Sequence, residues 1–248
     1  MKEDVVISVK NVRKTFYIRE NQHATIRDRL LNTFNKNPLR KIEALKPVSF
    51  EVKRGEFFSI LGSNGSGKTT LLNLIMGAIP PDDGGEISVN GKMIRLALGM
   101  GFNIDLTARE NILVNGSILG LSLAEIDTKF DEIIEFAELE DFINTPVKFF
   151  SSGMKSRLTF AIALHAKADI FLFDEFFGGV GDIVFKNKSE KVFNKSLVDG
   201  KTIILVSHSM PTIEKNSNRA LLLHYGQPIL IDKPSKVIKK YQEMSAKE

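Results

Sequence analysis

Apolar and polar residues follow distinct patterns along this chain, and each pattern predicts a type of element. Residues 5–12 alternate β-forming and polar residues, which predicts a strand. Residues 44–56 return to strand character, with Gly55 marking a turn. Short apolar runs that end in polar residues predict three buried strands. These runs are residues 57–61, 168–175 and 201–208.

Other segments predict a hairpin and helices. Residues 86–94 predict a hairpin about Asn90-Gly91, because this dipeptide favours a tight turn between strands. Residues 107–149 show the spacing of amphipathic helices. Residues 233–244 predict an exposed basic helix.

Residues 18–42 interrupt the strand pattern. Four apolar residues recur there at helical spacing, with charged residues on other faces. They are Ile26, Leu30, Leu31 and Phe34. The segment could form an amphipathic helix at a membrane face or a surface helix that packs on its own domain.

The order of these elements predicts an α/β core. A mostly helical insert separates the strand at 57–61 from the strand at 168–175. In such a fold the chemistry is expected at the carboxyl ends of the parallel strands.

A phosphate-binding loop follows the first buried strand. Residues 62–69, GSNGSGKT, match G-x-x-x-x-G-K-[ST] between a predicted strand and a predicted helix. The glycines let successive N–H groups point at phosphate oxygens, Lys68 reaches the β- and γ-phosphates, and the Thr69 hydroxyl can ligate Mg²⁺. The predicted nucleotide-binding residues here are Gly62, Ser63, Asn64, Gly65, Ser66, Gly67, Lys68, Thr69 and Thr70.

Polar residues end the other two buried strands. Asp174 is suited to Mg²⁺, and Glu175 can act as general base toward the attacking water. Alone, such acids are often only solvated strand ends; the phosphate-binding loop favours the catalytic interpretation. His208 could hydrogen-bond a γ-phosphate oxygen, although a lone histidine is more often structural.

A second Ser-Gly turn precedes a helical stretch at residues 151–153. Serine at a helix N-terminus caps it, and the exposed N–H groups attract anions. Ser151 precedes Asp174 by 174 − 151 = 23 residues. The turn is either a plain cap or the part of one chain that closes a nucleotide held by a second copy.

Composition narrows the class of protein. Of 248 residues, 43% are hydrophobic and 26% charged, as in ordinary soluble proteins. We expect no transmembrane helix, because no apolar run reaches about 18 residues, and no signal peptide. The absence of cysteine excludes disulfides and thiolate metal sites and suits the cytoplasm. The net charge of +4 is compatible with nucleic acid, an anionic membrane or a solvated surface.

These motifs together resemble the ATPase subunits of ABC transporters over nearly the whole chain, in order and in rough spacing. The family usually has Leu-Ser-Gly-Gly-Gln where this chain has residues 150–154, FSSGM. This variant signature, followed by SRL, is similar to ATPases that export O-antigen, capsule or teichoic-acid polysaccharides. Other segments also resemble that subgroup. They are LTARENI at 106–112, NGSILGL at 115–121, GVGD at 179–182 and the insertion at 18–42.

The resemblance implies a fold and a domain organisation. It implies a single ABC ATPase domain at residues 1–248, with a P-loop NTPase (RecA-like) α/β core and an N-terminal antiparallel β subdomain. The catalytic core and β subdomain would occupy about residues 1–100 and 160–248, and an inserted α-helical subdomain about residues 101–159.

The resemblance also implies roles for residues at a dimer interface. Ser151 and Gly153, with Ser152 and Met154 beside them, would meet the γ-phosphate held by a second copy, and Asp182 would lie in the loop that links the two sites. His208 would be the switch histidine. Phe16, rather than Tyr17, would stack on adenine, although an exposed strand aromatic is more often plain packing.

Two positions depart from the family pattern. The family has a Gln before the helical subdomain that reaches Mg²⁺. Asn103 is nearest in position and chemistry, but its side chain is one methylene shorter, so it is a weak candidate metal ligand. Met154 cannot hydrogen-bond as the usual Gln can, which leaves that contact to Ser151 and the backbone.

The resemblance therefore predicts an ATP- and Mg²⁺-dependent homodimeric subunit. It would bind a separate integral-membrane permease at the cytoplasmic face of the bacterial inner membrane and power export of lipid-linked polysaccharide. One alternative is an ABC ATPase for another cargo, such as a drug, lipid or solute. Another is a soluble ABC ATPase that acts on nucleic acid. We expect no nucleic acid, because the chain has one phosphate-binding loop and no long coiled-coil insert.

Overall fold

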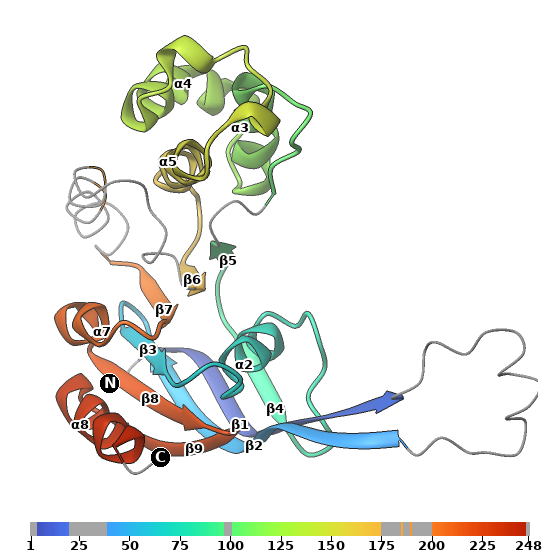
Figure 1. The fold of residues 1–248 in the computed structure, drawn as a ribbon, viewed down its shortest axis with the longest axis vertical. Coiled ribbons are helices and arrows are strands. Elements are labelled where there is room, and N and C mark those ends of the chain that lie inside the picture. The colour runs from blue at the N-terminus through green and yellow to red at the C-terminus, as the bar shows by residue number, and fades with distance from the viewer. Residues whose placement is uncertain are drawn as a thin grey trace, which may run out of the picture.

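Two β-sheets and a group of helices make up the fold (Figure 1). The structure, a computed structural model, describes residues 4–19, 39–96, 101–174, 185, 189 and 200–246. The strand order is β2-β1-β4 in one sheet and β5-β6-β7-β3-β8-β9 in the other. The three helices α3, α4 and α5 stand together at one end of the molecule, away from the two sheets (Figure 1). They are Ala108–Ile118, Leu123–Ala137 and Ser152–Ala163.

The six-stranded sheet is parallel except for its last strand, β9, which runs antiparallel to β8. The three predicted apolar runs form β3, β6 and β7, whose residues are almost all buried, as expected for strands covered on both faces. The sequence analysis did not predict β8 and β9. The strands are β3 (Phe57–Leu61), β5 (Met93–Leu96), β6 (Ile170–Asp174), β7 (Thr202–Val206), β8 (Arg219–His224) and β9 (Gln227–Asp232).

The three-stranded sheet is antiparallel, and two of its strands are longer than predicted. It contains β1 (Val5–Arg19), β2 (Leu39–Lys53) and β4 (Glu86–Val89). The pairing of β1 with β2 continues to Arg19 and Leu39, so both ends of the expected insertion at 18–42 are strand. Residues 20–38, with the predicted helix, lie outside the described part of the chain. The long strands extend past the rest of the sheet (Figure 1).

The predicted hairpin at residues 86–94 is wrong. Its first half, β4, pairs with β1, whereas its second half, β5, pairs with β6 in the other sheet. The Asn90 amide donates to the Val6 carbonyl and prolongs the first pairing. Lys92 then donates its amide to the Asp169 carboxylate at 2.8 Å, beside the start of β6. The tight turn therefore carries the chain between sheets, because each half finds its partner elsewhere.

A side-chain cap begins each of the three helices α3, α4 and α5, which together form the helical lobe, and two of these caps are reciprocal. Thr107 and Glu110 form a reciprocal capping box at α3, and Ser122 and Glu125 form one at α4. Short 3₁₀ turns at Glu140–Phe142 and Val147–Phe149 lead into α5. Helix α5 continues to Ala163, beyond residue 159, where the helical subdomain was expected to end.

Three clusters of buried apolar residues hold these layers together. One joins the lobe helices to one face of the six-stranded sheet, and a second lies between its other face, α2 (Lys68–Ile75) and the three-stranded sheet. The third joins β8 to α7 (Met210–Asn216) and α8 (Pro234–Ser245). The predicted C-terminal helix is thus confirmed as α8, but it is exposed only in part, because Val237 and Ile238 are buried. In the described residues, no helix has both the length and the apolar character needed to cross a membrane.

Candidate nucleotide-binding site

The predicted phosphate-binding loop joins the end of β3 to the start of α2. Helix α2 begins at Lys68, directly after Gly67, so its first N–H groups face the loop. The Ser66 amide donates to the Ser63 carbonyl, and the Ser66 carbonyl accepts from the Gly226 amide in the β8–β9 turn. The loop is therefore held from within and from a neighbouring turn, and its helix end can attract an anion.

Two loop glycines lie where a side chain does not fit. A Cβ on Gly62 would stand 2.3 Å from the Leu223 carbonyl oxygen. Gly67 has a φ of 100°, in the left-handed region, and a Cβ there would stand 2.6 Å from the Ala44 carbonyl oxygen. Both distances are far below van der Waals contact, so close backbone packing requires glycine at these positions.

We expect Gly67→Ala to lower both stability and nucleotide affinity. The left-handed conformation alone costs about 1–2 kcal/mol for alanine, and relief of the clash would shift the loop. Affinity for a fluorescent ATP analogue should fall at least about tenfold, which corresponds to about 1.4 kcal/mol. Gly77→Ala is the matched control, because Gly77 has a φ of 70° but nothing within 4 Å of a new Cβ. Equal affinity losses in the two variants would contradict this reading of the loop.

Lys68 is turned into the loop. Its Nζ donates to the Gly62 carbonyl at 2.8 Å and to the Ser63 carbonyl at 2.9 Å, and the residue is only 6% exposed. A strongly hydrated ammonium is rarely buried unless polar groups hold it. The loop thus presents a fixed positive charge where phosphates would lie.

A cavity of about 720 Å³ opens over this loop and is large enough for a nucleotide. Asp174 and Val206 from the carboxyl ends of β6 and β7 line it together with loop residues. Its remaining lining comes from β2 and from the β8–β9 turn. The lining residues are Ile42, Glu43, Ala44, Asn64, Gly65, Ser66, Gly67, Lys68, Thr69, Thr70, Asp174, Val206, Tyr225 and Gly226.

Tyr225 is a site residue that the sequence analysis missed. It is 67% exposed at the cavity rim, and with Gly226 it forms a turn in which both residues have positive φ. The two strands that flank the turn are apolar, and Tyr-Gly between them was a usable hairpin signal. The turn brings an aromatic ring to the edge of the nucleotide cavity.

The residues present fit a magnesium-bound nucleotide. The Ser66 hydroxyl is buried and finds no hydrogen-bond partner among the described residues, which leaves a polar group in the loop for a ligand to satisfy. Thr69 and Asp174 face the same cavity and offer the hydroxyl and carboxylate oxygens that Mg²⁺ prefers. Asp174 also accepts a hydrogen bond from Arg95 at 2.5 Å, a contact that the sequence did not predict.

Phe16 lies near the cavity but does not line it. It pairs across the sheet with Ile42, which does line the cavity, whereas Tyr17 pairs with Lys41 on the opposite face. Phe16 is 36% exposed, and the Lys14 ammonium lies 5.8 Å from its ring centroid. The register supports the choice of Phe16 over Tyr17 as the ring available to adenine.

The predicted signature turn begins α5. The Ser151 hydroxyl accepts from the Met154 amide at 3.1 Å, so Ser151 is the N-cap of this helix. Ser151 and Ser152 are exposed, whereas Met154 is half-buried against the lobe core. Met154 therefore contributes packing in place of the hydrogen bonds of a glutamine. Among the described residues that line the loop cavity, none comes from this turn.

The remaining predicted residues stand in different places. His208 is exposed two residues beyond the end of β7. Asp174 ends the neighbouring strand β6, so both residues lie at the carboxyl ends of the parallel strands. Asn103 lies in the turn before α3, where its side-chain oxygen accepts from the Asp105 amide at 3.1 Å. This bond gives Asn103 a local structural role. Glu175 and Asp182 lie outside the described residues.

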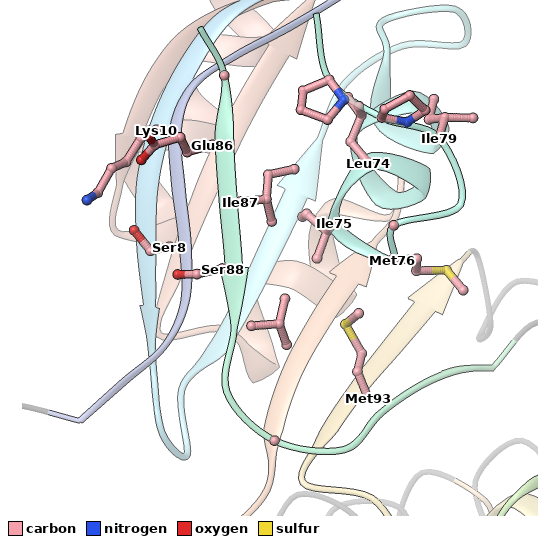
Figure 2. A pocket seen from close by; sticks show the side chains of 16 residues that line it. Ser8, Lys10, Leu74, Ile75, Met76, Ile79, Glu86, Ile87, Ser88 and Met93 are labelled. Carbon is pink, nitrogen blue, oxygen red and sulfur yellow. The ribbon is translucent and has the colours of Figure 1, made fainter. Parts of the chain in front are cut away.

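A larger hollow lies on another side of the molecule. It has a volume of about 920 Å³, between the end of α2 and the strands β1 and β4. Figure 2 shows Ile75, Ile87 and Met93 around it, with Lys10 and Glu86 to one side. Its lining is mainly aliphatic and includes neither the phosphate-binding loop nor Lys68 and Asp174, which line the smaller cavity, so the smaller cavity is the candidate site.

Comparison with known proteins gives relatives along almost the whole chain. The ABC transporter family profile matches residues 45–178. The teichoic acids export ATP-binding protein TagH of Enterococcus faecalis is 39% identical, over 98% of this chain and 53% of TagH. The O-antigen export system ATP-binding protein RfbB of Myxococcus xanthus is 40% identical, over 96% and 55%. The ABC transporter protein AbcA of Aeromonas salmonicida is 38% identical, over 96% and 76%. The chain thus spans about half the length of the first two relatives.

Solved structures of ATP-binding cassettes align with most of this chain. The dimeric, post-hydrolysis state of the ATP-binding cassette MJ0796 with ADP and Pi aligns with a TM-score of 0.72 and 26% identity, over 92% of this chain and 98% of that one. A second dimeric structure of MJ0796 aligns with a TM-score of 0.71 and 27% identity, with the same coverage.

Proposed function

The chain belongs to the ABC transporter family and has the fold of its ATPase cassettes, and from this we propose that it is the ATP-binding and ATP-hydrolysing subunit of a polysaccharide exporter. The observation that carries the nucleotide part of the proposal is the loop with its inward lysine, which shares one cavity with Asp174. Phosphate, a divalent cation and adenine each have a fitting partner around that cavity.

The cargo is proposed from the relatives. TagH and RfbB are named for export of teichoic acids and O-antigen, and their similarity extends over 96% or more of this chain. Both are cell-surface polysaccharides. We therefore propose a lipid-linked polysaccharide as the cargo, a separate integral-membrane permease as the partner, and a peripheral position at the cytoplasmic face of the bacterial inner membrane.

The residues divide the chemistry between them. Bound ATP supplies the phosphoanhydride bond that water breaks. The loop N–H groups and Lys68 would hold its phosphates and neutralise the charge that develops on them. Thr69 and Asp174 would hold Mg²⁺, and Glu175 would take the proton of the attacking water. His208 would hydrogen-bond a γ-phosphate oxygen.

A second copy of the chain would complete the site. The loop and the Ser151 turn belong to different parts of the fold, and Ser151 and Ser152 are exposed at the head of α5. Two chains arranged head to tail would place this turn, with Gly153, against the nucleotide of the other chain. ATP would then favour the closed dimer and ADP the open one, which supplies the motion for transport. Asp182 would lie in the loop between the two sites.

Two alternatives change the partner rather than the site. An ABC ATPase for a drug, lipid or solute would share every residue of the nucleotide cavity. A soluble ABC ATPase that acts on nucleic acid would be consistent with the charge of +4. The sequence variant at residues 151–154 and the named relatives favour polysaccharide.

Isolation of the membrane complex tests the proposal. We expect tagged chain, extracted from cells in mild detergent, to retain a polytopic membrane protein and to release phosphate from ATP. Reconstituted with that partner in vesicles, the complex should move lipid-linked polysaccharide across the bilayer only when ATP is supplied. A Lys68→Ala complex should assemble but neither hydrolyse ATP nor transport. If the complex transports another cargo and no polysaccharide, the proposed cargo is wrong. The assignment as an ATPase would still hold.

A further inference from the structure

Arg95 lies directly beside the proposed metal ligand. It stands on β5, paired with Leu172 of β6, and its guanidinium NH2 group donates to Asp174 Oδ2 at 2.5 Å. Its NH1 group donates to Asn73 Oδ1 on α2 at 3.1 Å. The guanidinium is thus fixed between two elements that also form the nucleotide cavity.

This ion pair differs from an ordinary surface pair. The side chains of Arg95 and Asp174 are only 18% and 15% exposed. Arg95 Nε is buried and finds no hydrogen-bond partner among the described residues. Burial limits screening by water, so the charge of Arg95 acts strongly on the carboxylate. The guanidinium therefore bonds Asp174 and Asn73 but leaves one buried donor unsatisfied.

The pair conflicts with the role proposed for Asp174. Asp174 lines the nucleotide cavity with Thr69, where it would serve Mg²⁺. A carboxylate oxygen that accepts a short bond from arginine is less available to a metal ion, and two cations on one carboxylate repel each other. Arg95 and Mg²⁺ therefore compete for Asp174.

We propose that Arg95 is a positioning residue that occupies the cation position of Asp174 before nucleotide binds and must yield it to Mg²⁺. The inference rests on the proposed function, because it assumes that Asp174 serves the metal. Room for the displaced guanidinium exists. Arg95 also lines a cavity of about 170 Å³ toward the helical lobe, with the polar side chains of Asn115 and Thr159 in its wall. Arg95 thus sets the metal affinity of the site and links it to the lobe.

Two binding measurements test this role, because the affinities for metal and for metal-free nucleotide should change in opposite directions. Mn²⁺ replaces Mg²⁺, and electron paramagnetic resonance measures its binding to the chain in the presence of a non-hydrolysable ATP analogue. Arg95→Met should bind Mn²⁺ roughly tenfold more tightly than wild type, because a competing charge is removed. The same variant should bind metal-free nucleotide in EDTA about threefold more weakly, because the unpaired carboxylate of Asp174 then faces the phosphates.

Matched variants separate competition from structure. Arg95→Lys keeps the charge and should stay within about threefold of wild type for Mn²⁺. Arg95→Gln lacks the charge but can still bond Asn73, so it should behave like Arg95→Met and carries the test if Arg95→Met does not fold. Arg219→Met removes an arginine from an ion pair with Glu56 at the amino-terminal ends of β3 and β8, whereas Asp174 lies at the carboxyl end of β6. This variant should leave Mn²⁺ affinity unchanged.

The outcomes distinguish this inference from the proposed function. Mn²⁺ affinity that is unchanged or weaker in both uncharged variants would overturn the competition, since a purely structural arginine would weaken metal and nucleotide together. Wild-type chain that binds no nucleotide, with or without metal, would instead remove the proposed function itself.

Discussion

Glu175→Gln is expected to reduce ATP turnover at least about 100-fold while ATP binding persists. Glutamine has nearly the shape of glutamate but cannot take a proton from the attacking water. ATP therefore stays intact between the two chains, and the closed dimer should accumulate. Phosphate release measures the first effect, and light scattering after size-exclusion chromatography with Mg·ATP measures the second.

A surface glutamate supplies the control for this experiment. Glu243→Gln on the exposed side of α8 makes the same chemical change at a residue that does not line the nucleotide cavity and should leave turnover and oligomeric state as in wild type. A monomeric Glu175→Gln chain with full turnover would show that another group is the base.

Mixing two inactive variants should restore activity if sites are shared between chains. Lys68→Ala removes the charge that the loop holds at 2.8 Å from the Gly62 carbonyl, and Ser151→Arg blocks the head of α5. Each variant alone should lose at least about 100-fold in turnover, since catalysis of phosphoryl transfer depends on positioning and charge. In a mixed dimer, the Lys68 of one chain meets the Ser151 of the other, so one complete site forms.

Random pairing sets the size of the recovery. Half of the dimers are mixed and each has one complete site of two, so turnover should return to about a quarter of wild type if sites act independently. Ser151→Ala is the control for the cap that Ser151 provides to Met154, whose loss alone costs about 1 kcal/mol of stability. A mixture that stays as inactive as its components contradicts the sharing of sites.

Local chemistry made much of the site predictable. The loop at 62–69 needs glycines, a lysine and a hydroxyl at fixed spacing, so its residues and its place between a strand and a helix could be inferred from sequence alone. Asp174 was accessible for the same reason, because an apolar run ended in an acid. The inferred α/β fold with a helical insert agrees with the cassette structures of similar proteins.

Contacts between distant segments were not predictable in this way. The Asn90-Gly91 turn has the local signal of a hairpin, but its two halves pair with β1 and β6 instead of each other. The contact of Arg95 with Asp174 depends on the pairing of β5 with β6, and no local signal in the sequence indicates that pairing. The same holds for Tyr225, which reaches the cavity because β8 lies beside β3. A single sequence carries no record of such pairings.

The contact between the phosphate-binding loop and the β8–β9 turn has a consequence for variation in this chain. The Gly226 amide bonds the Ser66 carbonyl, and the Gly226 carbonyl accepts from the Lys46 amide, so backbone atoms alone join three distant segments. Because these bonds use no side chain, they do not depend on which residue replaces Tyr225. They do depend on the number of residues in the turn. A substitution at Tyr225 should therefore leave this joint intact, whereas a side chain at Gly226, where φ is 73° and a Cβ would stand 2.9 Å from the Ala44 carbonyl oxygen, or a single inserted or deleted residue would misalign the loop. A site-specific label can therefore be attached at position 225 without breaking this joint, whereas a peptide tag inserted in the turn would break it.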